Sequence, residues 1–117
     1  MMKKLLLGLG ISLFLFVPAF SATFGEVNAL RAAENYLEIM PLSYSGLIRQ
    51  LELAEFLHSE AVYGADNCKA DWNEQAVKAA KTYLEIMPLS RSGLIKQLER
   101  VGFTHEQAVY GAEQNGY

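Results

Sequence analysis

The sequence predicts an all-α protein made of two tandem three-helix, helix-turn-helix-like repeats that follow an N-terminal signal peptide. Three observations predict this class. A shift of 47 positions aligns residues 29–70 with residues 76–117 without a gap, and 25 of these 42 positions are identical. Apolar side chains in each copy recur at steps of three and four, the spacing of one helical face. Residues 1–21 lie outside the repeat and differ from it in composition.

Residues 1–21 have the layout of a secretory signal peptide. Lys3 and Lys4 precede an uncharged apolar run at 5–17, and the small residues Ala19 and Ser21 follow. A basic start, a short apolar run and small residues are typical of a cleaved leader. We expect cleavage between Ser21 and Ala22. The alternative is an uncleaved anchor, because residues 5–24 are 20 positions without a charge, enough to span a bilayer.

The first helix of each repeat is expected at 27–39 and 72–86. In the second copy, Asp71 and Glu74 have the spacing of a capping box. Pro41 and Pro88 should end the two helices, because the residue before a proline is pushed out of helical geometry. The expected apolar face of the first copy consists of Ala29, Ala33, Tyr36, Leu37 and Met40.

The second helix is expected at 44–54 and 91–101, with Ser43 and Ser90 as N-caps. Its buried stripe is predicted to be Leu47, Ile48 and Leu51, and in the other copy Leu94, Ile95 and Leu98. Gly102 suits the left-handed position after the helix. Glu55 stands at the matching place in repeat 1, so that turn is either strained or built differently.

The third helix is expected at 58–66 and 105–113. Thr104 and Gln107 form a second capping box. Leu57 lacks the capping hydroxyl, and Ser59 is expected to cap instead. Repeat 1 should therefore be the less stable half.

The domain boundaries that follow are repeat 1 at 27–66, a linker at 67–71 and repeat 2 at 72–117. Units this small bury little apolar surface alone, so the two repeats are expected to stack. Trp72 has no counterpart in repeat 1, and we expect it to pack between the units.

Charge indicates which partners are expected. The whole chain carries a net charge of −3, and without residues 1–21 it has 8 basic and 13 acidic residues, a net charge of −5. Such a chain binds nucleic-acid phosphate poorly. The repeats differ, since residues 29–64 carry −3 and residues 76–111 carry +2. We expect partner-binding side chains beside the second helices: Tyr44, Arg49, Arg91, Lys96 and Arg100.

The chain offers little to catalysis or metal binding. His58 and His105 occupy equivalent places in separate repeats, and Cys68 is a single thiol that we interpret as an incidental linker residue. No nucleophile elbow, zinc-protease motif or phosphate loop occurs. The sequence therefore predicts no enzyme activity, no cofactor and no metal site.

Several strings carry a resemblance to a known family: Ala70-Asp-Trp-Asn-Glu-Gln-Ala76, Ser90-Arg-Ser-Gly-Leu-Ile-Lys-Gln-Leu-Glu99 and Gly102-Phe-Thr104. Over residues 27–117 the chain resembles the Ltp family, the host cell surface-exposed lipoproteins of Gram-positive bacteria and their phages. The resemblance implies paired three-helix repeats displayed outside the membrane. In phage-encoded members it implies superinfection exclusion, in which an injected phage protein is engaged and foreign DNA is kept out.

The resemblance has one departure. Lipidation needs a cysteine directly after the apolar stretch, and the first cysteine here is Cys68. The chain therefore looks like a non-lipidated member, secreted or at the cell surface, with membrane contact only through an uncleaved leader. We predict an extracytoplasmic module that binds another protein, either a phage injection component or an envelope protein. Two alternatives stay open: a general cell-envelope interaction protein with no phage role, and a helix-turn-helix DNA-binding protein.

Overall fold

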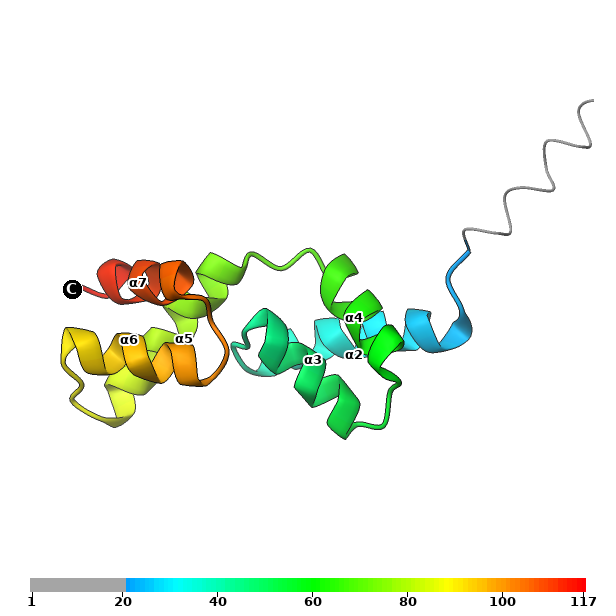
Figure 1. Ribbon diagram of the computed structural model, residues 1–117, viewed down its shortest axis with the longest axis horizontal. Coiled ribbons are helices and arrows are strands. Elements are labelled where there is room, and N and C mark those ends of the chain that lie inside the picture. Colours follow the sequence, from blue (N-terminus) through cyan, green and yellow to red (C-terminus); the bar gives the residue numbers. More distant parts are fainter. Residues whose placement is uncertain (1–20) are drawn as a thin grey trace, which may run out of the picture.

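The computed structural model describes residues 21–117, and all of its regular structure is helical within that range. The predicted leader at 1–20 lies outside the described residues, so cleavage between Ser21 and Ala22 stays a prediction. The helices, shown in Figure 1, are α2 (Phe24–Ile39), α3 (Tyr44–Leu53), α4 (His58–Asn67), α5 (Trp72–Ile86), α6 (Arg91–Arg100) and α7 (His105–Gln114). The all-α class with two three-helix repeats is confirmed.

Helix α2 starts three residues earlier than expected, at Phe24. The cause is a capping box that the sequence reading missed. The Thr23 hydroxyl accepts a hydrogen bond from the Glu26 N–H at 3.1 Å, and the Glu26 carboxylate accepts one from the Thr23 N–H at 2.8 Å. The helix ends at Ile39, where Met40 turns to an extended conformation ahead of Pro41, as predicted.

At the start of helix α5 the capping box that the sequence predicts is only half formed. Asp71 caps it as predicted, accepting from the Glu74 N–H at 3.1 Å. The expected return bond from Glu74 is not formed in the described chain. The capping-box prediction for this helix was therefore half wrong, and one carboxylate does the capping.

Helices α3 and α6 begin on serine caps. The Ser43 hydroxyl accepts from the Gly46 N–H at 2.9 Å, and the Ser90 hydroxyl accepts from the Gly93 N–H at 3.1 Å. The predicted stripes face the cores, since Leu47, Leu51, Leu94, Ile95 and Leu98 are buried and Ile48 is half-buried.

The turns after α3 and α6 are built alike despite Glu55. The Phe56 N–H reaches the Leu51 carbonyl at 3.2 Å, and in repeat 2 the Phe103 N–H reaches the Leu98 carbonyl at 3.1 Å. Glu55 has φ +72° and Gly102 has φ +105°. A side chain in this region costs about 1 kcal/mol, so of the two expected outcomes the strained one is found.

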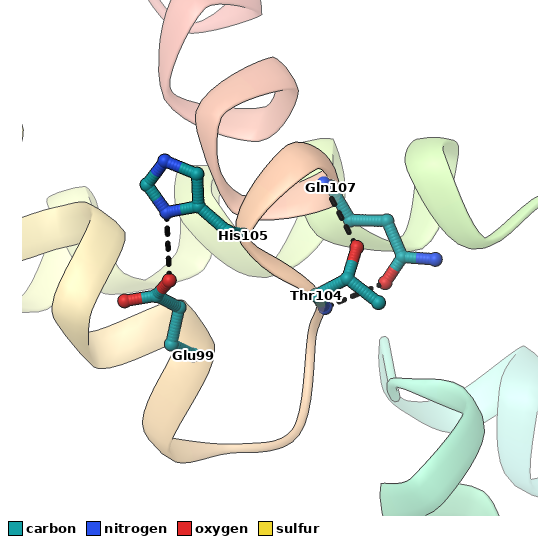
Figure 2. A network of polar contacts seen from close by, with 4 residues as sticks. All are labelled: Glu99, Thr104, His105 and Gln107. Carbon is teal, nitrogen blue, oxygen red and sulfur yellow. Dashed lines mark hydrogen bonds and ion pairs between the residues drawn. The ribbon is translucent and has the colours of Figure 1, made fainter.

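Helices α4 and α7 differ at their caps. In repeat 2 the Thr104 hydroxyl accepts from the Gln107 N–H at 3.1 Å and the Gln107 side chain accepts from the Thr104 N–H at 2.9 Å, as Figure 2 shows. In repeat 1, Leu57 is the N-cap residue and offers no acceptor, while Glu60 accepts from the Leu57 N–H at 2.9 Å. The expectation that Ser59 caps α4 was wrong, because the helix already begins at His58.

Each repeat buries its own core, made chiefly of small and branched side chains. In repeat 1 the buried cluster is Ala33, Leu47, Leu51, Ala61 and Ala65. In repeat 2 it is Ala76, Ala79, Ala80, Leu94, Ile95, Leu98, Phe103, Ala108 and Ala112. On the expected face of α2, Ala29 and Ala33 are buried, Tyr36 and Leu37 are half-buried and Met40 is 36% exposed.

The two repeats contact each other, but each has a separate core. Figure 1 shows them side by side, with α3 of repeat 1 near α5 and the α6–α7 turn of repeat 2. The extensive helix packing lies within repeats, α2 against α4 and α5 against α7. Alanine-rich helix faces pack closely enough for each three-helix unit to have its own core, and the junction joins loop residues with Trp72 and Gln75 of α5.

Candidate functional site

The junction between the repeats is made by hydrogen bonds from two serines. The Ser43 hydroxyl, which caps α3, also donates to the Val101 carbonyl at 2.8 Å. The Ser45 hydroxyl donates to the Gly102 carbonyl at 3.2 Å. A Cβ at Gly102 would overlap both serine hydroxyls, so glycine is needed here for close approach as well as for its φ. We call Ser43, Ser45, Val101 and Gly102 the serine–glycine joint.

A buried amide supports this joint from α5. The Gln75 side-chain oxygen accepts from the Leu42 N–H at 3.1 Å, and Gln75 is 7% exposed. Buried polar groups stabilise only when they are paired. The pairing therefore fixes how repeat 1 sits on repeat 2.

A cleft of about 320 Å³ opens beside the joint, between the two repeats. Its wall combines apolar side chains with Arg49, and Arg49 is exposed. The cleft therefore combines apolar side chains with one cation. The lining residues are Met40, Pro41, Leu42, Ser43, Gly46, Arg49, Gln50, Ala79, Tyr83, Val101 and Phe103.

Trp72 lies where α5 meets the core of repeat 1. Its ring is 5.6 Å from the Tyr44 ring at an interplanar angle of 84°, an edge-to-face contact. Tyr44 in turn donates from its hydroxyl to the Asp66 carboxylate at 2.6 Å. This hydrogen bond, with smaller contributions from burial and from the Asp66 charge, raises the pKa of Tyr44 above its ordinary value.

The predicted basic residues of α6 do not form one patch. Lys96 and Arg100 lie one helical turn apart on the same face, whereas Arg91 lies on another side of the helix. Arg91 contacts Glu113 at 3.3 Å, and Arg100 donates to Gln97 at 2.6 Å. Lys96 is the repeat-2 equivalent of Arg49, the one predicted cation that lines the cleft.

The contacts that brace each repeat use equivalent positions with different chemistry. Tyr44–Asp66 in repeat 1 corresponds to Arg91–Glu113 in repeat 2, 47 residues further along. Two side chains chosen as partner contacts therefore also hold the start of the second helix to the end of the third. The structure brings Tyr44 and Trp72 together and leaves the α6 cations elsewhere.

The histidines have a structural partner each. His105 lies 2.8 Å from a Glu99 carboxylate oxygen, seen at the left of Figure 2, and His58 lies 2.7 Å from Glu52. Their side chains are 71% and 73% exposed. Each pair ties the second helix to the third across the turn, and exposed pairs of this kind contribute little stability.

Residues 21–117 contain neither a metal-binding cluster nor a helix that could span a membrane. No group of three or more histidine, cysteine or acidic side chains there converges to hold a metal ion. None of the helices in this range is both long and apolar enough to cross a bilayer. Cys68 is half-buried against the repeat 1 core, and its thiol donates to the Ala65 carbonyl at 3.4 Å.

The sequence reading missed the joint and the cleft. Ser43 was read only as a helix cap, because its equivalent Ser90 has the same neighbours. Gln75 gave a faint signal, since its amide is carried on a side chain one methylene longer than that of Asn28, its repeat-1 equivalent. The contact between distant turns has no local pattern that could have revealed it.

Known proteins match the chain in family and in fold. The family model described as "Host cell surface-exposed lipoprotein" matches residues 26–68 and again 71–114. No curated protein matches. A solved structure, that of Ltp, a superinfection exclusion protein from the Streptococcus thermophilus temperate phage TP-J34, is similar with a TM-score of 0.75 and 25% identity, covering 80% of this chain and 97% of that one. The two family matches fall on the two repeats, and the chain therefore belongs to the Ltp family of host cell surface-exposed lipoproteins.

Proposed function

We propose that this protein acts outside the cytoplasm in superinfection exclusion, by binding a protein of the incoming phage's injection apparatus and thereby blocking DNA injection. The observation that carries the proposal is the likeness to Ltp, which spans 97% of that chain and includes both repeats. The family description places its members at the cell surface, where an injected phage protein would be met.

The cleft supports a binding role for the paired repeats. It lies where both repeats contribute side chains, and it joins apolar walls to the exposed Arg49 guanidinium. Arginine is favoured at protein interfaces because its planar group pairs with carboxylates and stacks on aromatic rings. A partner segment with an acidic residue beside apolar ones fits this surface.

The charge distribution favours a protein partner over DNA. Helices α4 and α7 occupy the place of a recognition helix in a helix-turn-helix, and neither contains a lysine or an arginine. Recognition helices read base edges and phosphates with cations and amides. The acidic chain from residue 22 onward adds to this argument.

The test is to express the full chain in a phage-sensitive host and to measure adsorption and DNA injection separately. We expect unchanged adsorption and a loss of DNA injection for at least one phage of a broad panel. A variant without residues 2–21 should fail to protect, because it stays on the wrong side of the membrane. Normal injection across the panel, in cells shown to export the folded protein, would overturn the proposal.

Matched charge reversals locate the binding surface. Arg49→Glu should abolish protection, whereas Arg31→Glu makes the same charge change at an exposed α2 position away from the cleft lining. Lys96→Glu and Lys78→Glu form the corresponding pair in repeat 2. Equal protection by all four variants would assign partner binding to another surface.

A further inference from the structure

Each side of the serine–glycine joint has an equivalent in the other repeat that makes no contact between repeats in the described part of the chain. Ser90 and Ser92 are the repeat-2 equivalents of Ser43 and Ser45, and both are exposed. The turn at Ala54 and Glu55 is the repeat-1 equivalent of Val101 and Gly102, and it is also exposed. Repeat 2 therefore presents the donor half of the joint, and repeat 1 presents the acceptor half.

Complementary halves on one molecule invite head-to-tail association with further copies. Such a contact joins different surfaces of the two partners, so it can continue from copy to copy into a ring or an open chain. Within the molecule the same contact is already made, with hydrogen bonds of 2.8 Å and 3.2 Å from Ser43 and Ser45. The same geometry would place the two serines of repeat 2 in one molecule on the α3–α4 turn of another.

Glu55 differs from Gly102 in the one property that the joint requires. At Gly102 a Cβ would overlap the hydroxyls of the two serines that dock there. Glu55 carries that Cβ in the same left-handed turn, at φ +72°. The turns share their backbone hydrogen bonds, so an incoming pair of serines would meet the Glu55 side chain at the place where glycine leaves room.

The positive φ of Glu55 is a strained conformation for a residue with a side chain. Glycine would relieve the cost of a positive φ at this exposed turn, yet repeat 1 keeps a side chain here. Within residues 21–117 the Glu55 carboxylate makes no hydrogen bond, and the backbone bond from its N–H to the Glu52 carbonyl is one that glycine makes equally at 102. Strained residues persist where they serve another purpose. Excluding a second copy is a purpose that needs only the Cβ and is strengthened by a charge.

We infer that Glu55 is a stop residue, which prevents the Ser90–Ser92 edge of one molecule from docking on the α3–α4 turn of another and so keeps the joint internal. The Ser90–Ser92 edge then stays free of other copies of this chain. A second difference also disfavours docking between molecules. Gln75 supports the internal joint, and its repeat-1 equivalent is the shorter Asn28, so a second copy would be held mainly by the two serine hydrogen bonds. This inference is independent of the proposed function.

The experiment compares Glu55→Gly with Glu55→Asn in the purified full-length protein. Asparagine tolerates a positive φ but keeps a Cβ, so it relieves strain without opening the docking site. An internal contact benefits from an effective concentration in the millimolar range. Amide NMR spectra should therefore be compared between about 0.05 and about 1 mM. We expect Glu55→Gly alone to show concentration-dependent shifts at residues 54–57 and 89–93, with an apparent mass above that of the monomer.

Three outcomes would overturn the inference. In the first, Glu55→Gly shows no such shifts. In the second, Glu55→Asn or the wild type associates as strongly as Glu55→Gly. In the third, adding Ser92→Lys to Glu55→Gly leaves the association unchanged. The converse variant Gly102→Asn keeps the test decisive should Glu55→Gly misfold. It places a Cβ inside the internal joint, and small-angle scattering should show the repeats moving apart while both stay helical. An unchanged scattering profile would refute the steric argument.

Discussion

Replacing Ser43 by alanine tests whether the joint stabilises the protein or merely accompanies the fold. The Ser43 hydroxyl makes two short hydrogen bonds, one that caps α3 at Gly46 and one that reaches Val101 in the other repeat, and it lies 3.5 Å from the Ser45 hydroxyl. Its equivalent Ser90 makes only the capping bond, at 3.1 Å. Ser43→Ala therefore removes both contacts, and Ser90→Ala removes the cap alone.

The expected magnitudes follow from this difference. Loss of a serine cap costs about 1 kcal/mol. Loss of a further hydrogen bond adds about 1 kcal/mol, and the burial of Ser43, which is 1% exposed, keeps water from replacing it. We expect Ser43→Ala to lower the free energy of unfolding by about 2 kcal/mol and Ser90→Ala by about 1 kcal/mol.

Urea unfolding measures both variants, because the single Trp72 packs on repeat 1 and reports its unfolding by fluorescence, while circular dichroism follows all helices. Hydrogen exchange adds a local readout: Ser43→Ala should speed exchange at residues 101–103, which belong to the other repeat. Equal losses of stability in the two variants, together with unchanged exchange at 101–103, would refute the role given to the joint.

Three further substitutions have defined outcomes. Leu57→Thr gives α4 the capping hydroxyl that Thr104 gives α7, and thermal unfolding should show a gain of about 1 kcal/mol; no gain would mean that Glu60 already satisfies the helix start. Gly102→Ala should cost at least about 1 kcal/mol from its positive φ, and more from overlap with the docked serines, measured against wild type by urea unfolding. Tyr44→Phe removes the hydrogen bond to Asp66 and should cost about 1 kcal/mol near neutral pH. Because the folded-state pKa of Tyr44 is raised above 10.0, the wild-type advantage is present below that value and is lost as the pH rises through the raised pKa; an advantage that persists at higher pH would contradict this assignment.

Local patterns allowed the helices to be predicted. The proline ends, the serine caps and the spacing of Leu47 and Leu51 each depend on residues within about one turn of each other, and sequence shows such neighbours directly. The exceptions were also local: Thr23 was overlooked as a cap, and Glu74 did not complete its box. Whether a side chain reaches back to the cap depends on its rotamer, which the residue type alone does not fix.

Contacts between the repeats could not be predicted in the same way. Ser43 and Val101 are 58 residues apart, and their meeting depends on how two closed units settle against each other. Self-similarity indicates that neighbouring repeats contact each other, but it does not show which residues meet. The partner-binding residues were chosen by their place beside the second helices and by charge differences between the repeats. Neither criterion shows tertiary contacts, so Arg49 lines the cleft while Arg91 contacts Glu113.

The position of Trp72 has a consequence for how the protein matures. The residue belongs to the first turn of α5, yet it packs against the hydrophobic cluster of repeat 1. A chain is synthesised from its N-terminus, and the segment that emerges first has the first chance to fold. Repeat 1 therefore lacks its last aromatic neighbour until the first turn of α5 has packed against it, so the folding of repeat 1 is completed by a residue of the next repeat.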